Sequence, residues 1–238
     1  MNPLLDEPLS VALLRTGWAA TLSADELEVA SRGTFDRIYP AGVVVAPLGE
    51  VAEHWIGVIC GMVKVDTSLA DGKSTTFIGV STGGWLGEGS LLKRESRPYE
   101  VVALKESRIA FMSRPTFEWL YEYSLSFNHF LISQLNARLA QFISMVERSR
   151  MHSPTEIIAF GLASLLHPKL SPSPSQTLLI SQEELGKLCG LSRQAANKGL
   201  HQLMEQGLID VEYRAILVKD LEGLRSAARV VPGTERSD

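Results

Sequence analysis

The stretch that decides the fold is Ser181-Gln-Glu-Glu-Leu-Gly-Lys-Leu-Cys-Gly-Leu-Ser-Arg-Gln-Ala-Ala-Asn-Lys-Gly-Leu200. Ser181 followed three residues later by Glu184 is the pattern of a capping box, which opens a helix. Gly190 ends that helix, and Ser192 is a good N-cap for a second one. The stretch therefore predicts two helices joined by a tight turn, an arrangement in which the second helix can lie in the major groove of DNA.

The second predicted helix has one apolar and one polar face. Ala196, Leu200 and Leu203 recur at helical spacing and are expected to face inward. Arginine and lysine suit the edge of guanine, whereas glutamine and asparagine suit adenine. Side chains of these types lie on the outward face near the helix start, at Arg193, Gln194, Asn197 and Lys198. The outward face is therefore chemically suited to reading base edges.

The C-terminal third of the chain predicts a small mixed domain around these helices. The expected elements are a strand at Thr177–Ile180, helices at Glu183–Cys189 and Arg193–Gln206, and paired strands at Leu208–Val211 and Ala215–Val218. Tyr213 and Arg214 lie at the tip of the strand pair, placed like a wing for phosphate contact. Ser153-Pro154 starts an earlier helix to about Leu166, and the proline-rich run His167–Ser175 is expected to be a loop.

Residues Gly42–Gly89 are rich in glycine between short β-branched runs. Such runs at close spacing predict a β-roll, sandwich or barrel. Strands are expected at Val43–Val45, Trp55–Ile59, Thr75–Val80, Val101–Ala103 and Arg108–Met112. A short helix precedes them at Ser23–Ser31, where Glu26 follows Ser23 by three residues. Asp71-Gly-Lys-Ser-Thr75 lacks the first glycine of a phosphate-binding loop and is interpreted as a hairpin turn.

A long apolar stripe follows the predicted strands. Between Leu125 and Glu147 apolar residues recur every three or four positions, which predicts one helix about 36 Å long at 1.5 Å per residue. Because this exceeds the usual three turns, we expect the stripe to pair with that of a second subunit. The predicted interface residues are Phe127, Leu131, Leu135, Leu139, Phe142 and Val146. The alternative, that the stripe packs only on its own β-domain, stays open.

These patterns together predict an α+β fold of several parts. The predicted boundaries are 1–123 for a β-roll, 124–148 for the dimerisation helix, 149–153 for a hinge, 154–230 for a winged helix-turn-helix domain and 231–238 for a frayed tail. The roll is expected to be of the double-stranded β-helix or jelly-roll type.

Composition bounds the class of protein. The 238 residues, 45% hydrophobic and 21% charged, favour a globular chain of two domains. Met1–Asp6 lacks an export signal and no apolar run reaches membrane-spanning length, so a cytoplasmic protein without a membrane partner is expected. The net charge of −4 does not exclude DNA binding, because a local basic face matters more. Cys60 and Cys189 are far apart and the histidines are scattered, so no disulfide or metal site is expected; a redox role of Cys60 stays open.

The order of these parts, with Leu179–Gln194 and Leu203–Ile209, resembles the Crp/Fnr superfamily of bacterial transcription regulators over most of the chain. The resemblance implies a homodimer that binds double-stranded DNA and works with RNA polymerase. It places the family's base-reading Arg, Glu and Arg on Arg193, Gln194 and Lys198; because two of the three differ, we expect a half-site other than the family's usual one. The residues expected to contact DNA are Ser181, Ser192, Arg193, Gln194, Asn197, Lys198 and Arg214.

Gly84-Trp-Leu-Gly-Glu-Gly-Ser-Leu-Leu-Lys-Arg-Glu-Ser-Arg-Pro98 resembles the phosphate-binding cassette of cyclic-nucleotide-binding domains. The resemblance implies that Arg97 and backbone amides hold a cyclic phosphate while Glu88 accepts from a ribose 2′-hydroxyl. Pro98 has no N–H, and the Phe142-Ile143 pair lacks the hydroxyls that meet adenine in cyclic-AMP regulators, which counts against cyclic AMP. The expected effector-binding residues are Gly87, Glu88, Gly89, Ser90, Arg97, Pro98 and Phe142.

Several alternatives stay open. The cassette is compatible with a cyclic mononucleotide, with another ligand such as cyclic di-GMP or a metabolite, and with no ligand at all. Glu88 and Arg97 can also form an internal ion pair that braces the roll. An enzyme is disfavoured, because no nucleophile, base and orienting group show a recognisable spacing. The remaining rival is a nucleotide-binding sensor that acts through protein contacts alone.

Overall fold

The computed structural model describes residues 3–68, 74–148, 153–173 and 175–228. Its mixture of helices and strands confirms the predicted α+β class. The chain forms two compact units, one of Met1–Leu139 with Pro168–Ser173 and one of Ala140–His167 with Pro174–Asp238. Most of the predicted hinge, at 149–152, the turn at 71–73 and the predicted tail at 231–238 lie outside the described residues. The predicted domain boundaries therefore stay predictions.

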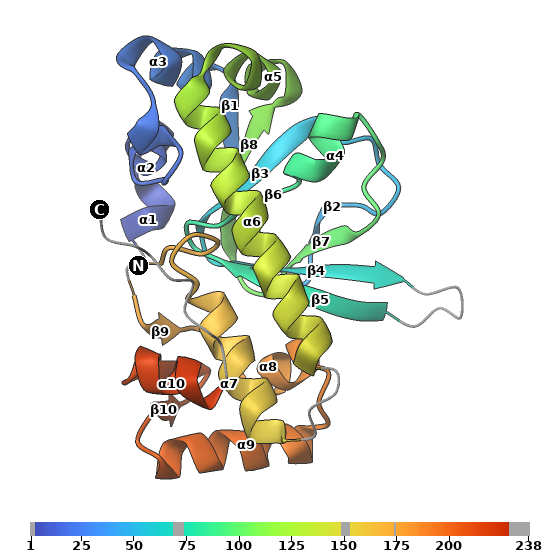
Figure 1. The fold of residues 1–238 in the computed structure, drawn as a ribbon, viewed down its shortest axis with the longest axis vertical. Helices are drawn as coiled ribbons and strands as arrows, with labels where there is room; N and C mark the ends of the chain where they lie inside the picture. Colours follow the sequence, from blue (N-terminus) through green and yellow to red (C-terminus); the bar gives the residue numbers. More distant parts are fainter. Residues whose placement is uncertain (1–2, 69–73, 149–152, 174, 229–238) are drawn as a thin grey trace. The chain divides into compact units, whose positions relative to one another are not determined.

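The first unit is built on two antiparallel four-stranded sheets (Figure 1). One sheet, in spatial order, consists of β1 (Thr34–Tyr39), β8 (Ser107–Ser113), β3 (His54–Cys60) and β6 (Trp85–Leu86). The other consists of β2 (Val44–Ala46), β7 (Glu100–Ala103), β4 (Met62–Ser68) and β5 (Ser74–Ser81). Among the described neighbours only β4 and β5 are consecutive in the chain, which is the pattern of a rolled sheet rather than a meander. The predicted β-roll is confirmed.

All five strands predicted for this unit are present with bounds within one residue, but β1, β4 and β6 were not predicted. In β1 the charged residues Asp36 and Arg37 interrupt the apolar alternation, which hides the strand. Asp36 is neutralised across the sheet by Arg108 of β8, whose Nε lies 2.5 Å from its carboxylate. The charge that obscures the strand in the sequence thus helps to hold it in place.

Short helices flank the sheets of the first unit. They are α1 (Pro3–Asp6), α2 (Leu9–Leu14), the 3-10 turn η1 (Ala19–Thr21), α3 (Ala24–Arg32), α4 (Glu88–Lys93) and α5 (Arg114–Tyr123). The helix predicted near Ser23 is confirmed as α3: the Glu26 N–H donates to Ser23 Oγ at 3.3 Å, and the Ser23 N–H donates to the Glu26 carboxylate at 2.7 Å. Of the others, α4 lies within the predicted cassette and therefore shapes it.

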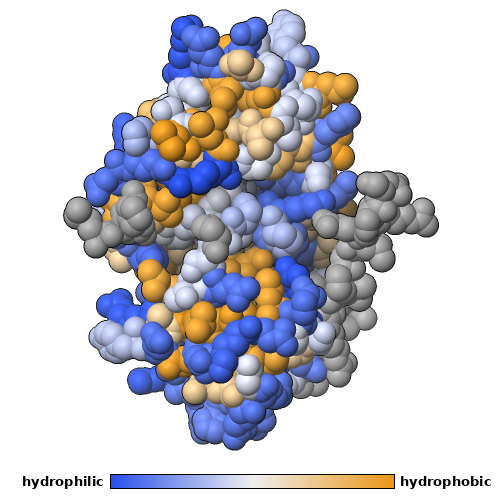
Figure 2. Space-filling model, turned by 90° about the vertical axis from the view of Figure 1, so that its left-hand side faces the viewer, coloured by the Kyte–Doolittle hydropathy of each residue, from blue (hydrophilic) through white to orange (hydrophobic). Residues whose placement is uncertain are grey.

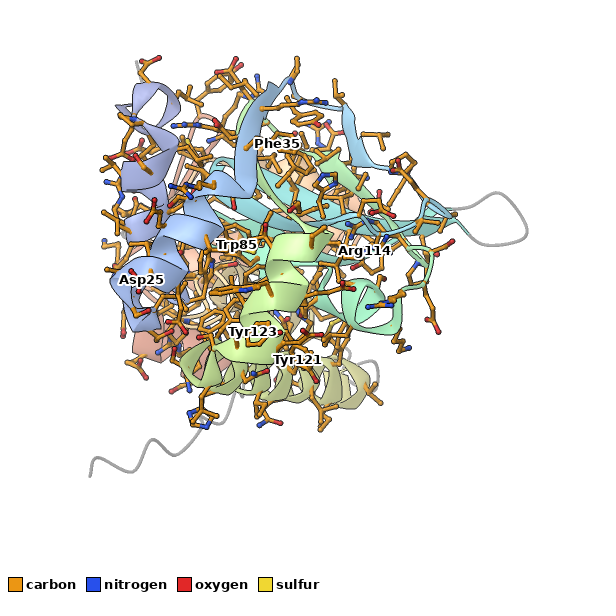
Figure 3. All side chains as sticks on the ribbon, turned by 90° about the horizontal axis from the view of Figure 1, so that it is seen from above. Asp25, Phe35, Trp85, Arg114, Tyr121 and Tyr123 are labelled. Atoms are coloured by element: carbon orange, nitrogen blue, oxygen red, sulfur yellow. The ribbon has the colours of Figure 1, made fainter. Side chains whose placement is uncertain are left out.

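An aromatic cluster forms one core of the first unit. The ring centroids of Trp55 and Trp85 are 4.4 Å apart, and those of Trp18 and Trp85 are 5.2 Å apart. Phe127 lies 5.6 Å from Trp55 and packs edge-on. Figure 3 shows Trp85 among the packed side chains of this unit, whereas Tyr123 is exposed at the end of α5. The cluster joins the N-terminal segment, the β-roll and the first turns of the next helix.

That next helix, α6 (Leu125–Arg148), confirms the predicted long helix and runs from the first unit into the second. The predicted interface is wrong at two positions: Phe127 and Leu131 are 0% and 2% exposed and pack in the aromatic core of their own unit. At these two positions the stripe packs on its own domain, so they are closed to a second subunit. The remaining predicted interface residues are exposed: Leu135, Leu139, Phe142 and Val146.

The described residues of the second unit form a three-stranded sheet and four helices besides the end of α6. In chain order they are α7 (Pro154–Leu165), β9 (Thr177–Leu178), α8 (Gln182–Leu188), α9 (Arg193–Glu205), β10 (Ile209–Glu212), β11 (Ala215–Val218) and α10 (Leu221–Ala227), with strand order β10-β11-β9. Ser153 lies at the N-cap of α7, but its side chain makes no capping bond. The unpredicted α10 is capped by Asp220, whose carboxylate accepts from the Gly223 N–H at 2.8 Å. The winged helix-turn-helix fold is confirmed.

The predicted loop after α7 belongs to the first unit over Pro168–Ser173. Ser171 Oγ accepts from the Ser81 N–H at 3.3 Å. Gly84 lies so close to the loop that a Cβ there would be 2.6 Å from the Leu170 carbonyl oxygen. This part of the loop is therefore packed against the end of β5 and the start of the cassette.

No helix among the described residues is long and apolar enough to cross a membrane. Hydrophilic and hydrophobic residues are mixed on the surface that Figure 2 shows. Single exposed apolar side chains of this kind are normal for a protein surface.

Candidate DNA-binding surface and effector site

Side-chain caps fix both helices of the helix-turn-helix. The Glu184 N–H donates to Ser181 Oγ at 3.1 Å and the Ser181 N–H donates to the Glu184 carboxylate at 3.0 Å, which confirms the capping box. At the start of α9 the Ala195 N–H donates to Ser192 Oγ at 3.3 Å. Ser181 and Ser192 thus hold the helix ends, and their contact with DNA stays a prediction.

The turn between α8 and α9 is closed by backbone bonds. Gly190 has a φ of +68°, a conformation that favours glycine. The Leu191 N–H donates to the Gly186 carbonyl at 2.9 Å, and the Gly190 N–H donates to the Lys187 carbonyl at 3.1 Å. These two bonds are those of a Schellman motif, so the angle between the helices is set by the backbone itself.

Helix α9 presents its two faces as the sequence predicts. Ala196, Leu200 and Leu203 are buried at 2% exposure or less. The four predicted base-reading side chains are brought together on the exposed face: Arg193, Gln194, Asn197 and Lys198. The surface therefore offers two cationic groups and two amides from the first two turns of one helix, a set that matches the edges of guanine and adenine.

A glycine seats α9 against α7. A Cβ at Gly199 would lie 2.8 Å from the carbonyl oxygen of Pro154, at the first residue of α7. Any side chain at position 199 would push the two helices apart. Gly199 was not predicted as a contact residue. Helical spacing places it on the inward face of α9, but it does not predict that the carbonyl of the distant Pro154 lies so close to it.

The hairpin that follows α9 carries the predicted wing. Strands β10 and β11 pair from Ile209 with Val218 to Glu212 with Ala215, which leaves Tyr213 and Arg214 as the turn. Tyr213 is 93% exposed and Arg214 is exposed with a φ of +57°. The tip therefore presents one aromatic ring and one guanidinium to solvent.

In the first unit, the cassette residue Glu88 is buried at the start of α4 and is paired on both oxygens. Arg138 of α6 contacts one oxygen through Nε at 3.2 Å, and the Trp55 indole N–H donates to the other at 3.4 Å. The alternative of an internal ion pair between Glu88 and Arg97 is wrong: the cation that pairs with Glu88 is Arg138. A ribose hydroxyl that donates to Glu88 must therefore share a carboxylate oxygen with Arg138 or with Trp55.

Arg97 is 4% exposed, and one end of its guanidinium lacks a partner. Nη2 donates to the His54 carbonyl at 2.5 Å. Nη1 is buried without a hydrogen-bond partner, and a Cβ on Gly87 would lie 2.5 Å from it. Burial lowers the pKa of Arg97, but a guanidinium stays charged at neutral pH. A buried donor of this kind costs free energy unless an acceptor reaches it, so the group fits an anion bound at Gly87.

Tyr99 lies beside Arg97 and was not singled out in the sequence. Its hydroxyl interacts with the Arg97 guanidinium, and Glu88 and Arg138 also act on it. Burial raises the pKa of Tyr99, so the phenol keeps its proton at neutral pH. The ring packs against the core between the two sheets.

Arg138 was also missed. Besides Glu88, its guanidinium donates to the Trp85 carbonyl at 2.9 Å, and Gln134, one helical turn earlier, reaches the same carbonyl at 3.4 Å. The helix carries other polar residues such as Asn128, Ser133 and Asn136, so nothing in the sequence distinguishes Gln134 and Arg138 from them. Fifty residues separate Arg138 from Glu88 in the chain, so local pattern could not pair them.

The other predicted effector residues take different positions. Gly87 has a φ of +97° and caps α4, Ser90 is buried, and Gly89 has open space beside it. Pro98 is exposed. Phe142 lies on the part of α6 that belongs to the second unit, and its role at the cassette stays a prediction.

Two family models match the chain. Residues 36–124 match the cyclic nucleotide-binding domain, and residues 137–227 match the Crp-like helix-turn-helix domain. Together they cover both sites described above.

Known proteins with the same organisation are similar over nearly their whole length. The cyclic AMP receptor protein of Thermus thermophilus is 24% identical over 207 residues, which cover 87% of this chain and 94% of that protein. The cAMP-activated global transcriptional regulator CRP of Pasteurella multocida is 28% identical over 183 residues, covering 76% and 88%.

Solved structures share the fold. FixK2 from Bradyrhizobium japonicum is 17% identical with a TM-score of 0.66, covering 84% of this chain and 99% of that one. The c-di-GMP responsive global regulator CLP of Xanthomonas campestris is 24% identical with a TM-score of 0.58, covering 82% and 99%.

The chain combines a cyclic nucleotide-binding type of β-roll, a long helix and a winged helix-turn-helix. This order of domains defines a class of transcription regulators. The chain belongs to the Crp/Fnr superfamily of this class. It is accordingly a DNA-binding transcription regulator.

Proposed function

We propose that this regulator is a homodimer that reads a palindromic operator through α9. The observation that carries the proposal is the set of four exposed polar side chains on the first two turns of α9, whose backbone is fixed by caps and a Schellman turn. A two-fold dimer presents this surface twice, about 34 Å apart, to successive turns of one face of DNA.

Each exposed side chain has a stated role in this proposal. Arg193 binds guanine and Gln194 binds adenine, each through two hydrogen bonds. Lys198 and Asn197 extend the reading surface along the groove. Arg214 at the wing tip contacts phosphate, which positions the domain without reading sequence.

The dimer interface is proposed to be the exposed part of the α6 stripe, without Phe127 and Leu131. It consists of Leu135, Leu139, Phe142 and Val146. These side chains are 39–64% exposed in the single chain, and continuous apolar stripes on long helices usually bury against a partner helix.

A carboxylate in this stripe opposes its burial in a dimer. Leu135→Glu is therefore expected to give monomers with weak operator binding, measured by sedimentation and mobility shift. A dimeric Leu135→Glu protein with normal binding would exclude this interface.

The cassette is proposed to bind an anionic effector, with a phosphodiester as the favoured class. The unpartnered Arg97 Nη1 at Gly87 supports an anion. A cyclic nucleotide and a cyclic dinucleotide both carry a singly charged phosphodiester, and the names of the similar regulators mention cyclic AMP and cyclic di-GMP. Arg138 ties the cassette to α6, so effector binding can change the balance between DNA-competent and incompetent poses. A coupling of about 1–3 kcal/mol is sufficient for such control.

The remaining parts of the proposal follow from the class. We place the protein in the cytoplasm with RNA polymerase as a partner, and assign it no enzymatic activity.

The decisive experiment is a mobility shift at stated salt with an operator selected from random DNA. Arg193→Ala is expected to weaken specific binding by at least about tenfold, because a two-bond arginine–guanine contact contributes roughly 1–3 kcal/mol in each half-site. Arg32→Ala, which removes an exposed arginine of α3, is the matched control and should bind normally. Equal binding by both variants would contradict the proposed role of α9.

A further inference from the structure

Two features of the cassette are unexplained by the family pattern. Pro98 directly follows Arg97, whose Nη1 lacks a partner, and has no N–H to donate. Tyr99 comes next, and its hydroxyl reaches back to the same guanidinium. An anion at Arg97 therefore loses one backbone donor but has a phenolic O–H nearby.

The charges around this point are unbalanced. The charged side chains that act on the Tyr99 hydroxyl are the buried guanidinium of Arg97, the partly buried guanidinium of Arg138 and the buried carboxylate of Glu88. Because Arg138 and Glu88 pair with each other, the charge of Arg97 is left over. These three side chains sum to one positive charge, which suits an anion, and the exposed carboxylate of Glu50 also acts on Arg97.

The geometry limits which groups can donate to that anion. Arg97 Nη1 is buried without a partner, whereas Nη2 is occupied by the His54 carbonyl. Both oxygens of Glu88 are occupied as well. Among the polar side chains described around Arg97, the Tyr99 hydroxyl carries a proton that none of these bonds uses.

We propose that Tyr99 is an effector-binding residue of this protein, whose phenolic O–H donates to a phosphodiester oxygen held by Arg97 and replaces the backbone N–H that Pro98 cannot supply. This inference rests on the proposed anionic effector. The core packing of the ring fixes the hydroxyl in place, so little conformational entropy is lost when the ligand binds.

The test uses the full-length protein and titration calorimetry with cyclic AMP, cyclic GMP and cyclic di-GMP as probes. For the probe that binds, Tyr99→Phe is expected to weaken binding about tenfold, since a hydrogen bond to a charged group is lost while the ring remains. Tyr39→Phe is the matched control, because Tyr39 packs against the same core and should leave binding unchanged. Thermal unfolding of each variant checks that the fold is kept.

Restoring the missing donor gives an independent measurement. Pro98→Ala supplies an N–H and is expected to tighten binding, and the double variant with Tyr99→Phe should recover most of the lost affinity. Unchanged binding by Tyr99→Phe would overturn the role of Tyr99, and so would a loss of affinity that Pro98→Ala does not recover. In both cases the wild-type chain still binds the effector, so the proposed effector site is kept. If none of the three probes binds the wild-type chain, the inference and the proposed effector fall together, and operator binding, measured separately, is untouched.

Discussion

The recognition surface of α9 and the cassette around Glu88 use similar residue types in opposite ways. On α9, Arg193 and Lys198 are exposed and the backbone beneath them is fixed by local bonds. At the cassette, Arg97 and Glu88 are buried and depend on partners from distant parts of the chain. The first region keeps its polar groups free for an outside partner, whereas the second has nearly satisfied its own. The side chains on α9 can therefore meet a partner without breaking a described bond, whereas a ligand hydroxyl at Glu88 must share an oxygen that already accepts from Arg138 or Trp55.

The largest effect that tests this contrast is expected at Glu88. Glu88→Ala leaves the partly buried Arg138 guanidinium and the buried Trp55 indole N–H without this acceptor, and breaking a buried pair costs up to about 3–5 kcal/mol. The unfolding midpoint in urea should fall accordingly. Glu183→Ala removes a carboxylate whose pair with Lys187 is exposed on α8, and no measurable change is expected. Similar unfolding midpoints for the two variants would contradict the claim that the buried pairs of the cassette contribute more to stability than the exposed pairs of the helix-turn-helix.

A smaller effect, on specificity alone, is expected at Gln194. Gln194→Glu replaces an amide that can bind adenine by a carboxylate that accepts from cytosine, so the preferred base should change by about 1–3 kcal/mol at one position of each half-site. Stability should stay within about 0.5 kcal/mol, because the side chain is exposed. Selection of binding sites from random DNA measures the preference. An unaltered site would show that Gln194 does not meet a base.

The smallest effect concerns pH and His54. Burial lowers the pKa of His54 below its ordinary value near 6.5, and the charge of Arg97 adds to this. Below about pH 6.5 the unfolded chain therefore binds more protons at His54 than the folded chain does. The contribution of neutral His54 to the free energy of unfolding is complete above that pH and is lost as the pH falls. Urea unfolding at pH 7.5 and 5.5 should show a smaller difference in His54→Gln than in the wild type. An equal difference in both would mean that His54 does not titrate with folding.

The same contrast explains what could be predicted from the sequence. Caps, the Gly190 turn and the exposed face of α9 depend on residues within a few positions of each other, so local pattern predicted them. The partner of Glu88 lies fifty residues away on α6, and the burial of Phe127 depends on Trp55 and on the N-terminal Trp18. Such contacts are set by topology, which periodicity does not report.

The loop at Pro168–Ser173 has a practical consequence. The first unit is not a continuous piece of chain, because this loop returns to it from beyond α7 and lies against Ser81 and Gly84. A fragment cut after Leu139 would leave that patch next to the cassette bare, and ligand affinities measured on such a fragment would describe an altered sensor.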